Sequence, residues 1–164
     1  MDTNLDPIMS LRSEHETVRG VLKNLDGYLK KIGSSSSDNL RKNLINQLDE
    51  ITSFIDKDLE THFKKEEEAL FPVLGNYVGI ETGPIHVMLI EHEQSRELST
   101  EFKTKISDYQ TNGDYNALIG AGNSFSLLLS EHIDKEENIL FNMASMHLSA
   151  DEKDDIMKKM RTIK

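Results

Sequence analysis

The sequence has 164 residues, a length that predicts a single domain over 1–164, with 19 Lys and Arg against 29 Asp and Glu, six His and no Cys. The net charge of −10 argues against nucleic acid or an anionic membrane as the main partner, because both would repel an acidic surface. The lack of Cys excludes disulfides, thiolate nucleophiles and cysteine-ligated iron–sulfur clusters, so any bound metal must take nitrogen and oxygen ligands.

The beginning of the chain predicts no targeting segment. Residues 1–11 lack both the basic region and the apolar stretch of a signal peptide. No run of about 18 apolar residues, the length that crosses a membrane, occurs in the sequence. We therefore expect a cytoplasmic protein with no membrane partner.

Two long helices are predicted in the first half, because apolar residues recur at steps of three and four. The first covers about 7–32. A short serine run then leads to Asp38, which suits the N-cap of the second helix. Pro72 and Gly75 are expected to interrupt this second helix near its end.

The second half has the same organisation. A third helix is predicted over about 84–112 and a fourth over about 114–140. A capping box at 149–152 starts a short fifth helix. The predicted fold is all-α: an up-down-up-down antiparallel four-helix bundle over about 8–145, followed by a short C-terminal fifth helix over about 150–163.

An internal repeat is the strongest signal in the sequence. Residues 14–19 (EHETVR) recur as residues 91–96 (EHEQSR), identical at four of six positions. Residues 62–71 (HFKKEEEALF) match residues 132–141 (HIDKEENILF) at one His, one Lys, two Glu, one Leu and one Phe. The chain therefore reads as a duplicated helical hairpin.

The repeated polar residues lie within the apolar stripes of the predicted helices, so their side chains should point into the core. His62 and Glu66 are four residues apart and share one helix face, as do His132 and Glu136. With antiparallel packing, the loop lengths bring all four repeated histidines toward the same end of the bundle. Six candidate metal ligands then face one small volume: His15, His62, Glu66, His92, His132 and Glu136.

A hydrogen-bonded core role would explain any one of these histidines taken alone. Unpaired buried carboxylates are costly, so their recurrence in both halves favours metal binding. If two carboxylates and an oxo or hydroxo group bridge two octahedral ions, about two coordination positions remain for an exogenous molecule or a fifth His. Five further glutamates lie off the stripes or at their edges and are expected at the surface or in support of the ligands: Glu14, Glu67, Glu68, Glu91 and Glu137.

The paired Glu-His motifs and the His-x-x-x-Glu-Glu-x-x-Leu-Phe motifs, together over about 8–145, resemble the hemerythrin-like proteins, the HHE cation-binding family. This resemblance implies a four-helix bundle with a non-haem di-iron centre. It also implies that the six candidate ligands bind two iron ions, with Glu66 and Glu136 bridging both.

The sequence departs from the oxygen-carrying hemerythrins at two places. Their third helix offers His-x-x-x-His, whereas here Met88 stands four residues before His92. Their fourth helix offers His followed by Asp five residues on, whereas here Glu136 follows His132 by four. These differences argue against a standard oxygen carrier. Ferritin-like di-iron bundles fit less well, because they use Glu-x-x-His and mostly carboxylates.

Two histidines lie outside the repeat. His86 stands six residues before His92, about 120° away from its helix face, although the backbone can differ so near a helix start. It is a candidate additional ligand or a residue that supports the ligands. His147 has no repeat partner and is expected at the surface or in packing.

The sequence leaves several functions open. In the first, the di-iron centre binds or senses a small molecule, oxygen or nitric oxide, or binds iron itself. In the second, it is a di-iron oxidase or peroxidase, or an iron donor in iron–sulfur cluster repair; that repair branch usually carries an additional cysteine-bearing domain, which is not in this sequence. A purely structural zinc site fits less well, because carboxylate bridging suits iron better. The catalytic residues and any protein partner stay unknown, and the fifth helix is a candidate homodimer contact.

Overall fold

The computed structural model describes residues 6–164, and this part of the chain is helical with no β-strand. Three of the segments are π-helical turns, labelled η. In chain order, the elements are α1 (Pro7–Ser34), α2 (Asp38–Phe54), η2 (Ile55–Leu59), α3 (Glu60–Lys65), η3 (Glu66–Leu70), α4 (Phe71–Val78), α5 (Pro84–Asn112), α6 (Tyr115–Lys135), η4 (Glu136–Leu140), α7 (Phe141–His147) and α8 (Ala150–Arg161).

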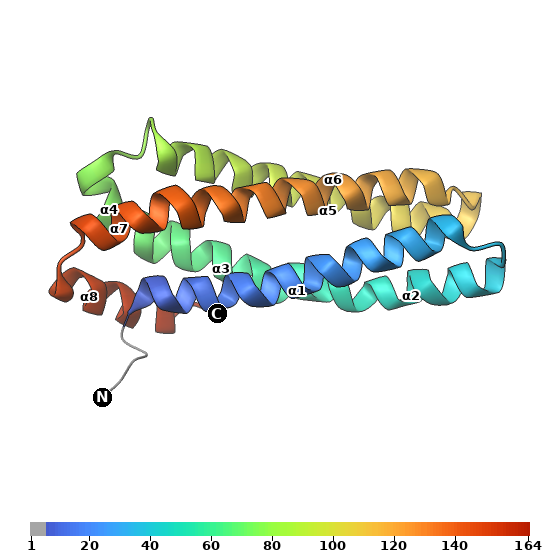
Figure 1. Cartoon of the computed structure of the whole chain (residues 1–164), viewed down its shortest axis with the longest axis horizontal. Helices are drawn as coiled ribbons and strands as arrows, with labels where there is room; N and C mark the ends of the chain where they lie inside the picture. Colours follow the sequence, from blue (N-terminus) through green and yellow to red (C-terminus); the bar gives the residue numbers. More distant parts are fainter. Residues whose placement is uncertain (1–5) are drawn as a thin grey trace.

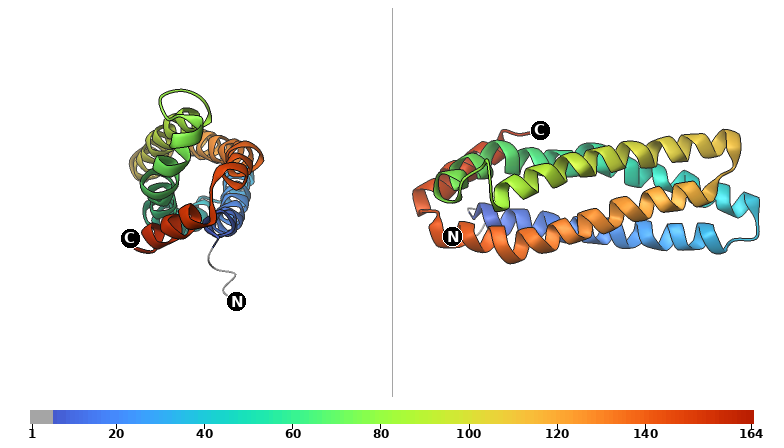
Figure 2. Two further views of the ribbon diagram at one scale, coloured as in Figure 1. Left: turned by 90° about the vertical axis from the view of Figure 1, so that its left-hand side faces the viewer. Right: turned by 90° about the horizontal axis from the view of Figure 1, so that it is seen from above.

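Four long helical rods lie side by side (Figure 1), consistent with a helical bundle. The rods are α1, the continuous run from α2 to α4, α5, and the continuous run from α6 to α7. Seen from its end, the bundle surrounds a common axis, and α8 lies across that end beside α1 (Figure 2). None of the described helices combines the length and the apolar character needed to span a bilayer.

The helix starts follow local capping chemistry. The Asp6 side chain accepts a hydrogen bond from the backbone N–H of Ile8, and Asp114 caps α6 in the same way. The cap of α2 is Ser37 rather than the predicted Asp38, because the Ser37 side chain reaches the N–H of Leu40. The predicted capping box is confirmed at Ser149. The Ser149 side chain accepts a hydrogen bond from the backbone N–H of Glu152, and the Glu152 side chain accepts one from the backbone N–H of Ser149.

The second rod does not stop at Pro72 and Gly75, so the predicted interruption is wrong. Its helix continues to Val78. The π-helical turn η3 precedes Pro72, and there the N–H of Phe71 donates to the C=O of Glu66, five residues back. Because Pro72 follows this widened turn, its ring and missing N–H are accommodated without breaking the rod.

The core consists of two apolar clusters separated by a polar layer. The longer cluster lies away from α8 and contains Leu25, Leu48 and Phe125. The shorter cluster lies at the α8 end and contains Leu70 and Phe141. Each long rod contributes to both clusters and carries buried polar residues between them. Burying polar groups in the middle of a core is costly unless they find partners, so this layer is the candidate site.

Candidate metal centre

The six predicted ligands lie together in the polar layer. His15 comes from α1, His92 from α5, and each of the other two rods supplies one His and one Glu. All six are buried, with at most 3% of any of them exposed. Their ligand atoms form two groups, each lying within 4.8 Å of one another: His15, His62, Glu66 and Glu136, and Glu66, His92, His132 and Glu136.

Glu66 and Glu136 belong to both groups, and their oxygens face the Nε2 atoms of the four imidazoles. Glu66 Oε1 lies 3.3 Å from Nε2 of His62 and 3.2 Å from Nε2 of His92. Glu136 Oε1 lies 3.0 Å from Nε2 of His15, and its Oε2 lies 3.9 Å from Nε2 of His132. The two carboxylates therefore stand between two pairs of imidazoles.

The Nε2 atoms of His15 and His62 lie 3.1 Å apart, within hydrogen-bonding distance, but the other close atoms have no hydrogen bond within the described residues. Both oxygens of Glu66, both oxygens of Glu136 and the Nε2 atoms of His92 and His132 are buried without a hydrogen-bond partner. Leaving so many polar atoms unpaired would cost several kcal/mol, since each unsatisfied buried group costs about 1–3 kcal/mol. Imidazole nitrogens and carboxylate oxygens that converge without hydrogen bonds fit metal ions as their missing partners.

Each of the four imidazoles is held from the outside by a different glutamate, and we term these four the outer carboxylates. The distances from Nδ1 to the carboxylate are 3.0 Å for His15 and Glu137, 2.9 Å for His62 and Glu14, 2.7 Å for His92 and Glu67, and 3.0 Å for His132 and Glu91. When Nδ1–H donates to a carboxylate, the lone pair of Nε2 is free for a metal.

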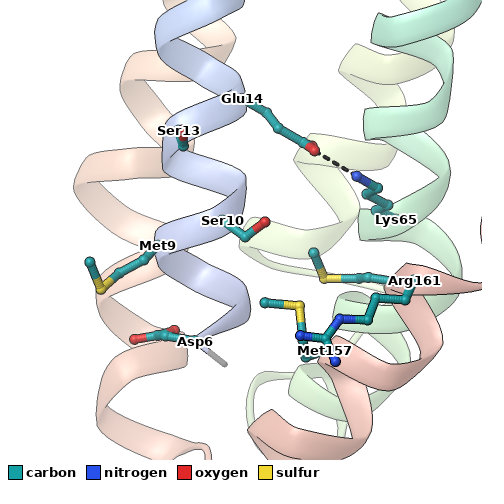
Figure 3. A pocket seen from close by; sticks show the side chains of 9 residues that line it. Asp6, Met9, Ser10, Ser13, Glu14, Lys65, Met157 and Arg161 are labelled. Atoms are coloured by element: carbon teal, nitrogen blue, oxygen red, sulfur yellow. Dashed lines mark hydrogen bonds and ion pairs between the residues drawn. The ribbon is translucent and has the colours of Figure 1, made fainter. Parts of the chain in front are cut away.

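The outer carboxylates are also paired with cations. Glu14 accepts from Lys65 at 2.6 Å and Glu91 accepts from Lys135 at 2.5 Å. Glu67 accepts from Arg96 at 3.0 Å. Figure 3 shows a cleft between α1 and α8, with the Glu14–Lys65 pair at the end away from α8. These cations offset the charge of the outer carboxylates and hold them in place against the imidazoles.

The burial and the charges of the centre raise the pKa values of three of its groups. Burial lowers the pKa of His62, but the charge of Glu66 and the hydrogen bond to Glu14 outweigh it and raise that pKa to about 10. The same balance raises the pKa of His92 to about 9. Burial and the facing charge of Glu66 raise the pKa of Glu136 to about 7. The centre therefore attracts positive charge, which protons or metal ions can supply.

Aromatic rings close the centre along the bundle axis. Phe141 stacks on His15 with ring centroids 5.2 Å apart. His92 has two such neighbours, Phe63 at 4.0 Å and Phe71 at 5.9 Å. Because these rings come from the two apolar clusters, the centre is shielded from bulk water.

The other residues singled out by the sequence lie outside the two groups. His86 is exposed near the start of α5 and belongs to neither group, so the structure does not support its predicted role as an additional ligand or as a residue that supports the ligands. Glu68 is exposed, so it is the one of the five edge glutamates that does not contact a candidate ligand. His147 is exposed and stacks on Tyr77 with ring centroids 5.4 Å apart.

Two features of the centre were not predicted from the sequence. One is the one-to-one pairing of imidazoles with outer carboxylates. The other is the π-helical turn that begins at each bridging candidate: η3 at Glu66 and η4 at Glu136. The adjacent glutamates at 66–67 and 136–137 were the available sequence signal for the outer carboxylates. Neighbouring residues on a helix point about 100° apart, so one glutamate can face inward while the next faces outward.

Comparison with known proteins gives a consistent result. The family model described as hemerythrin HHE cation binding domain matches residues 6–144. The iron-sulfur cluster repair protein YtfE of Salmonella schwarzengrund is 34% identical over 93 residues, which is 54% of this chain and 42% of that protein. The proteins of the same name from Salmonella paratyphi B and Salmonella newport are 33% identical over the same lengths. The match thus spans less than half the length of these relatives.

Proposed function

The chain belongs to the hemerythrin HHE cation-binding family, and we propose that it holds two iron ions in the polar layer between the two apolar clusters. His15 and His62 would bind one ion, and His92 and His132 the other. Glu66 and Glu136 would bridge both. We also propose that the four rods run antiparallel in up-down-up-down order and that they form a single domain.

The sharing of Glu66 and Glu136 between the two groups is the observation that carries this proposal. A mononuclear site would need only one carboxylate and two or three imidazoles, and a closed structural zinc site takes four ligands. Here two complete groups overlap in two carboxylates. Such sharing is typical of paired ions about 3.5–4 Å apart.

We propose that the centre binds a small molecule such as oxygen or nitric oxide. After the imidazoles, the two carboxylates and a bridging oxo or hydroxo group are counted, about two coordination positions of the octahedral ions stay open. The rings of Phe63, Phe71 and Phe141 restrict the space beside the ligands. Iron would supply reversible redox chemistry, while the outer carboxylates hold each imidazole in the orientation that presents Nε2.

A second candidate is supply of iron for the repair of iron–sulfur clusters. The relatives that carry this name are about one third identical to this chain over 93 residues. Their names concern whole proteins more than twice as long as the matched region, so the transfer is a proposal. A di-iron oxidase or peroxidase is a further alternative, since the same open positions would serve it.

The test is the iron content and the visible spectrum of protein purified from an iron-supplied culture. We expect about two irons per chain, the number of groups in the structure, and oxo-bridged ferric absorption. Reduction should bleach these bands, and oxygen should restore them over repeated cycles. Protein without iron, or zinc that iron does not displace, would contradict the proposal.

Controls separate the second candidate from the first. Loss of iron to an apo iron–sulfur protein in each cycle would favour iron supply over reversible binding. His86→Ala is the matched control, because His86 is exposed and lies outside both groups. This variant should retain two irons and the spectrum of the unchanged protein.

A further inference from the structure

A second cavity lies next to the candidate centre, between α5 and the rod that contains η2. Its volume is about 200 Å³. The residues that matter for its chemistry are Ile55 and Leu59 from η2, Phe63 from α3, and Ser95, Ser99 and Lys103 from α5. Because Ser95 follows His92 by three residues and Ser99 follows it by seven, the cavity continues the inward face of α5 away from the centre.

The wall of this cavity contains a hydroxyl without a protein partner. Ser99 is 4% exposed, and its Oγ has no hydrogen-bond partner among the described residues. An unpaired buried hydroxyl costs about 1–3 kcal/mol. Ser95 is also buried, at 2% exposed. A core position that needed only packing would be filled more favourably by an apolar side chain.

The repeat shows that the first half of the chain does use apolar side chains at these positions. Ser95 corresponds to Val18 in α1, and Ser99 corresponds to Leu22. Both Val18 and Leu22 belong to the longer apolar cluster. The small hydroxyl residues are therefore confined to one of the two otherwise similar sides of the bundle.

The helix opposite the two serines is also irregular. The π-helical turn η2 lies on the second rod, and the corresponding part of the fourth rod is regular α-helix within α6. α1 packs along α6 more closely than α5 packs along α2. π-helical turns are frequent at functional sites, and Ile55 and Leu59 of this one line the same cavity as Ser99.

Phe63 separates the cavity from the candidate metal ligands. Its ring lies 4.0 Å from the ring of His92, and the guanidinium of Arg96 lies 5.4 Å from its centroid on the cavity side. The corresponding residue of the repeat is Ile133. Two ion pairs beside the cavity join the two rods, Lys103 to Asp56 at 2.6 Å and Arg96 to Glu60 at 3.0 Å.

We propose that this cavity is the access route by which a small uncharged molecule, of the size of oxygen or nitric oxide, reaches the centre. The proposal rests on the proposed di-iron function. The exposed Lys103–Asp56 ion pair lies at the outer end, the hydroxyls of Ser95 and Ser99 line the middle, and the ring of Phe63 closes the inner end. Displacement of that ring connects the cavity to the side of His92 that faces the ligands.

A competing route begins at a different cavity of about 260 Å³ between α1 and α3. Thr17, Thr61 and the Glu14–Lys65 ion pair line it. This cavity reaches His62 on the side where Nδ1 is bonded to Glu14. A molecule in this cavity would face the outer carboxylate Glu14 rather than Nε2 of His62. We therefore expect that small molecules do not reach the centre through this cavity.

The experiment measures the binding of nitric oxide to the reduced, iron-loaded protein by stopped-flow absorption, with dissociation measured in the presence of a scavenger. The blocking variant Ser95→Val with Ser99→Leu introduces the residues that the repeat carries at these positions. We expect its association and dissociation rate constants to fall together about tenfold, equivalent to roughly 1.4 kcal/mol of barrier. The dissociation constant and the spectrum should not change.

Two further variants keep the test informative if the double variant folds poorly. Ser99→Val alone should slow both rate constants by a smaller factor, and Phe63→Ile, which introduces the repeat counterpart, should raise both. The metal-free forms of the serine variants should melt at or above the temperature of the unchanged protein, because an unpaired hydroxyl has been replaced by an apolar group.

Thr61→Leu is the matched control, because it adds bulk to the competing cavity and should leave both rate constants unchanged. Slower binding in Thr61→Leu, or unchanged rates in the serine variants of a protein that binds nitric oxide, would overturn the access route alone. Failure of the unchanged, iron-loaded protein to bind nitric oxide would overturn both the route and the proposed function.

Discussion

The two helical hairpins of this protein agree in the charged residues of the centre and differ in several of the side chains around it. The first hairpin runs from α1 to α4 and the second from α5 to α7. In both, an imidazole pairs with an outer carboxylate of the neighbouring rod, and that carboxylate pairs with a lysine or arginine. The repeat thus retains the positions that shape the centre.

The differences concern the space around the centre. Phe63 in the first hairpin corresponds to Ile133 in the second, and Ser99 in the second corresponds to Leu22 in the first. These changes leave the six candidate ligands in place but give one side of the bundle a cavity lined by hydroxyls. Equivalent residues of the centre should therefore respond alike to mutation, whereas residues around it should not.

The largest effect is expected from the shared carboxylates, because each belongs to both groups. Glu66→Ala and Glu136→Ala should each lose both metal ions, whereas His62→Ala and His132→Ala should each lose the ion nearer to them. Metal binding stabilises the folded form by about 2.7 kcal/mol per ion at a free concentration of 100 times Kd. Metal analysis and thermal denaturation with and without iron measure these losses.

Unequal behaviour within either pair would contradict the equivalence of the hairpins. Unchanged metal content in both carboxylate variants would contradict their role as shared ligands. The metal-free forms of these variants provide the control, since their melting temperatures separate lost metal binding from lost packing.

The stability of the metal-free protein should fall as the pH rises from about 7 to 10. The pKa values of His62 and His92, one from each hairpin, are raised from the usual 6.5 to about 10 and about 9. Protons bound more tightly in the folded state stabilise it below pH 6.5, and this contribution, on the order of a few kcal/mol, disappears as the two imidazoles lose their protons.

Urea denaturation of the metal-free protein across this pH range measures the effect. In the double variant His62→Ala with His92→Ala, the free energy of unfolding should depend less on pH. The His86→Ala variant should show the same pH dependence as the unchanged protein. Metal binding should have the opposite pH dependence, because metal ions replace these protons. A free energy of unfolding of the metal-free protein that rises from pH 7 to 10 would contradict the raised pKa values of His62 and His92.

The outer carboxylates offer a smaller and unequal effect. Glu14→Gln and Glu91→Gln keep the shape of the side chain but remove its charge, which should weaken metal binding by about 10- to 100-fold. The side chain of Glu91 is 9% exposed and that of Glu14 is 31% exposed. Competition titrations with a metal chelator should show the larger loss for Glu91→Gln, because its charge is less screened by water. Equal losses of metal affinity in the two variants would show that the greater burial of Glu91 does not strengthen its effect on the metal site.

The smallest effect is expected on the outer surface. Gly20 in α1 corresponds to Glu97 in α5, and a Cβ added at Gly20 would meet no atom within 4 Å. Gly20→Ala should stabilise the protein by about 0.5–1 kcal/mol through helix propensity. Denaturant unfolding should show this gain with metal content unchanged; a loss of metal would mean that the surface and the centre are coupled.

Much of the fold and of the centre could be predicted from the sequence because both are periodic. Apolar residues at steps of three and four locate the long helices, and the duplicated His and Glu residues stand where apolar side chains would otherwise be expected. The structure brings those six residues together. Helix and loop lengths predicted that the histidines lie toward one end of the bundle, since a helix rises 1.5 Å per residue. The structure places them at a common level, between the two apolar clusters.

The features that escaped prediction depend on packing between rods. A π-helical turn such as η3 has no local signature, so the continuation of the helix through Pro72 was missed. The pairing of Glu67 with His92 joins residues on different rods, and helix spacing fixes only the angle of each side chain on its own rod. The unpaired hydroxyl of Ser99 is likewise visible only after the rods are assembled.

Anomalous X-ray diffraction at the iron edge, from crystals of the iron-loaded protein, would locate the iron ions. We expect two peaks about 3.5–4 Å apart in the polar layer. Glu66 and Glu136 should contact both peaks, with one pair of imidazoles on each. A single peak, or two peaks that share neither carboxylate, would contradict this expectation.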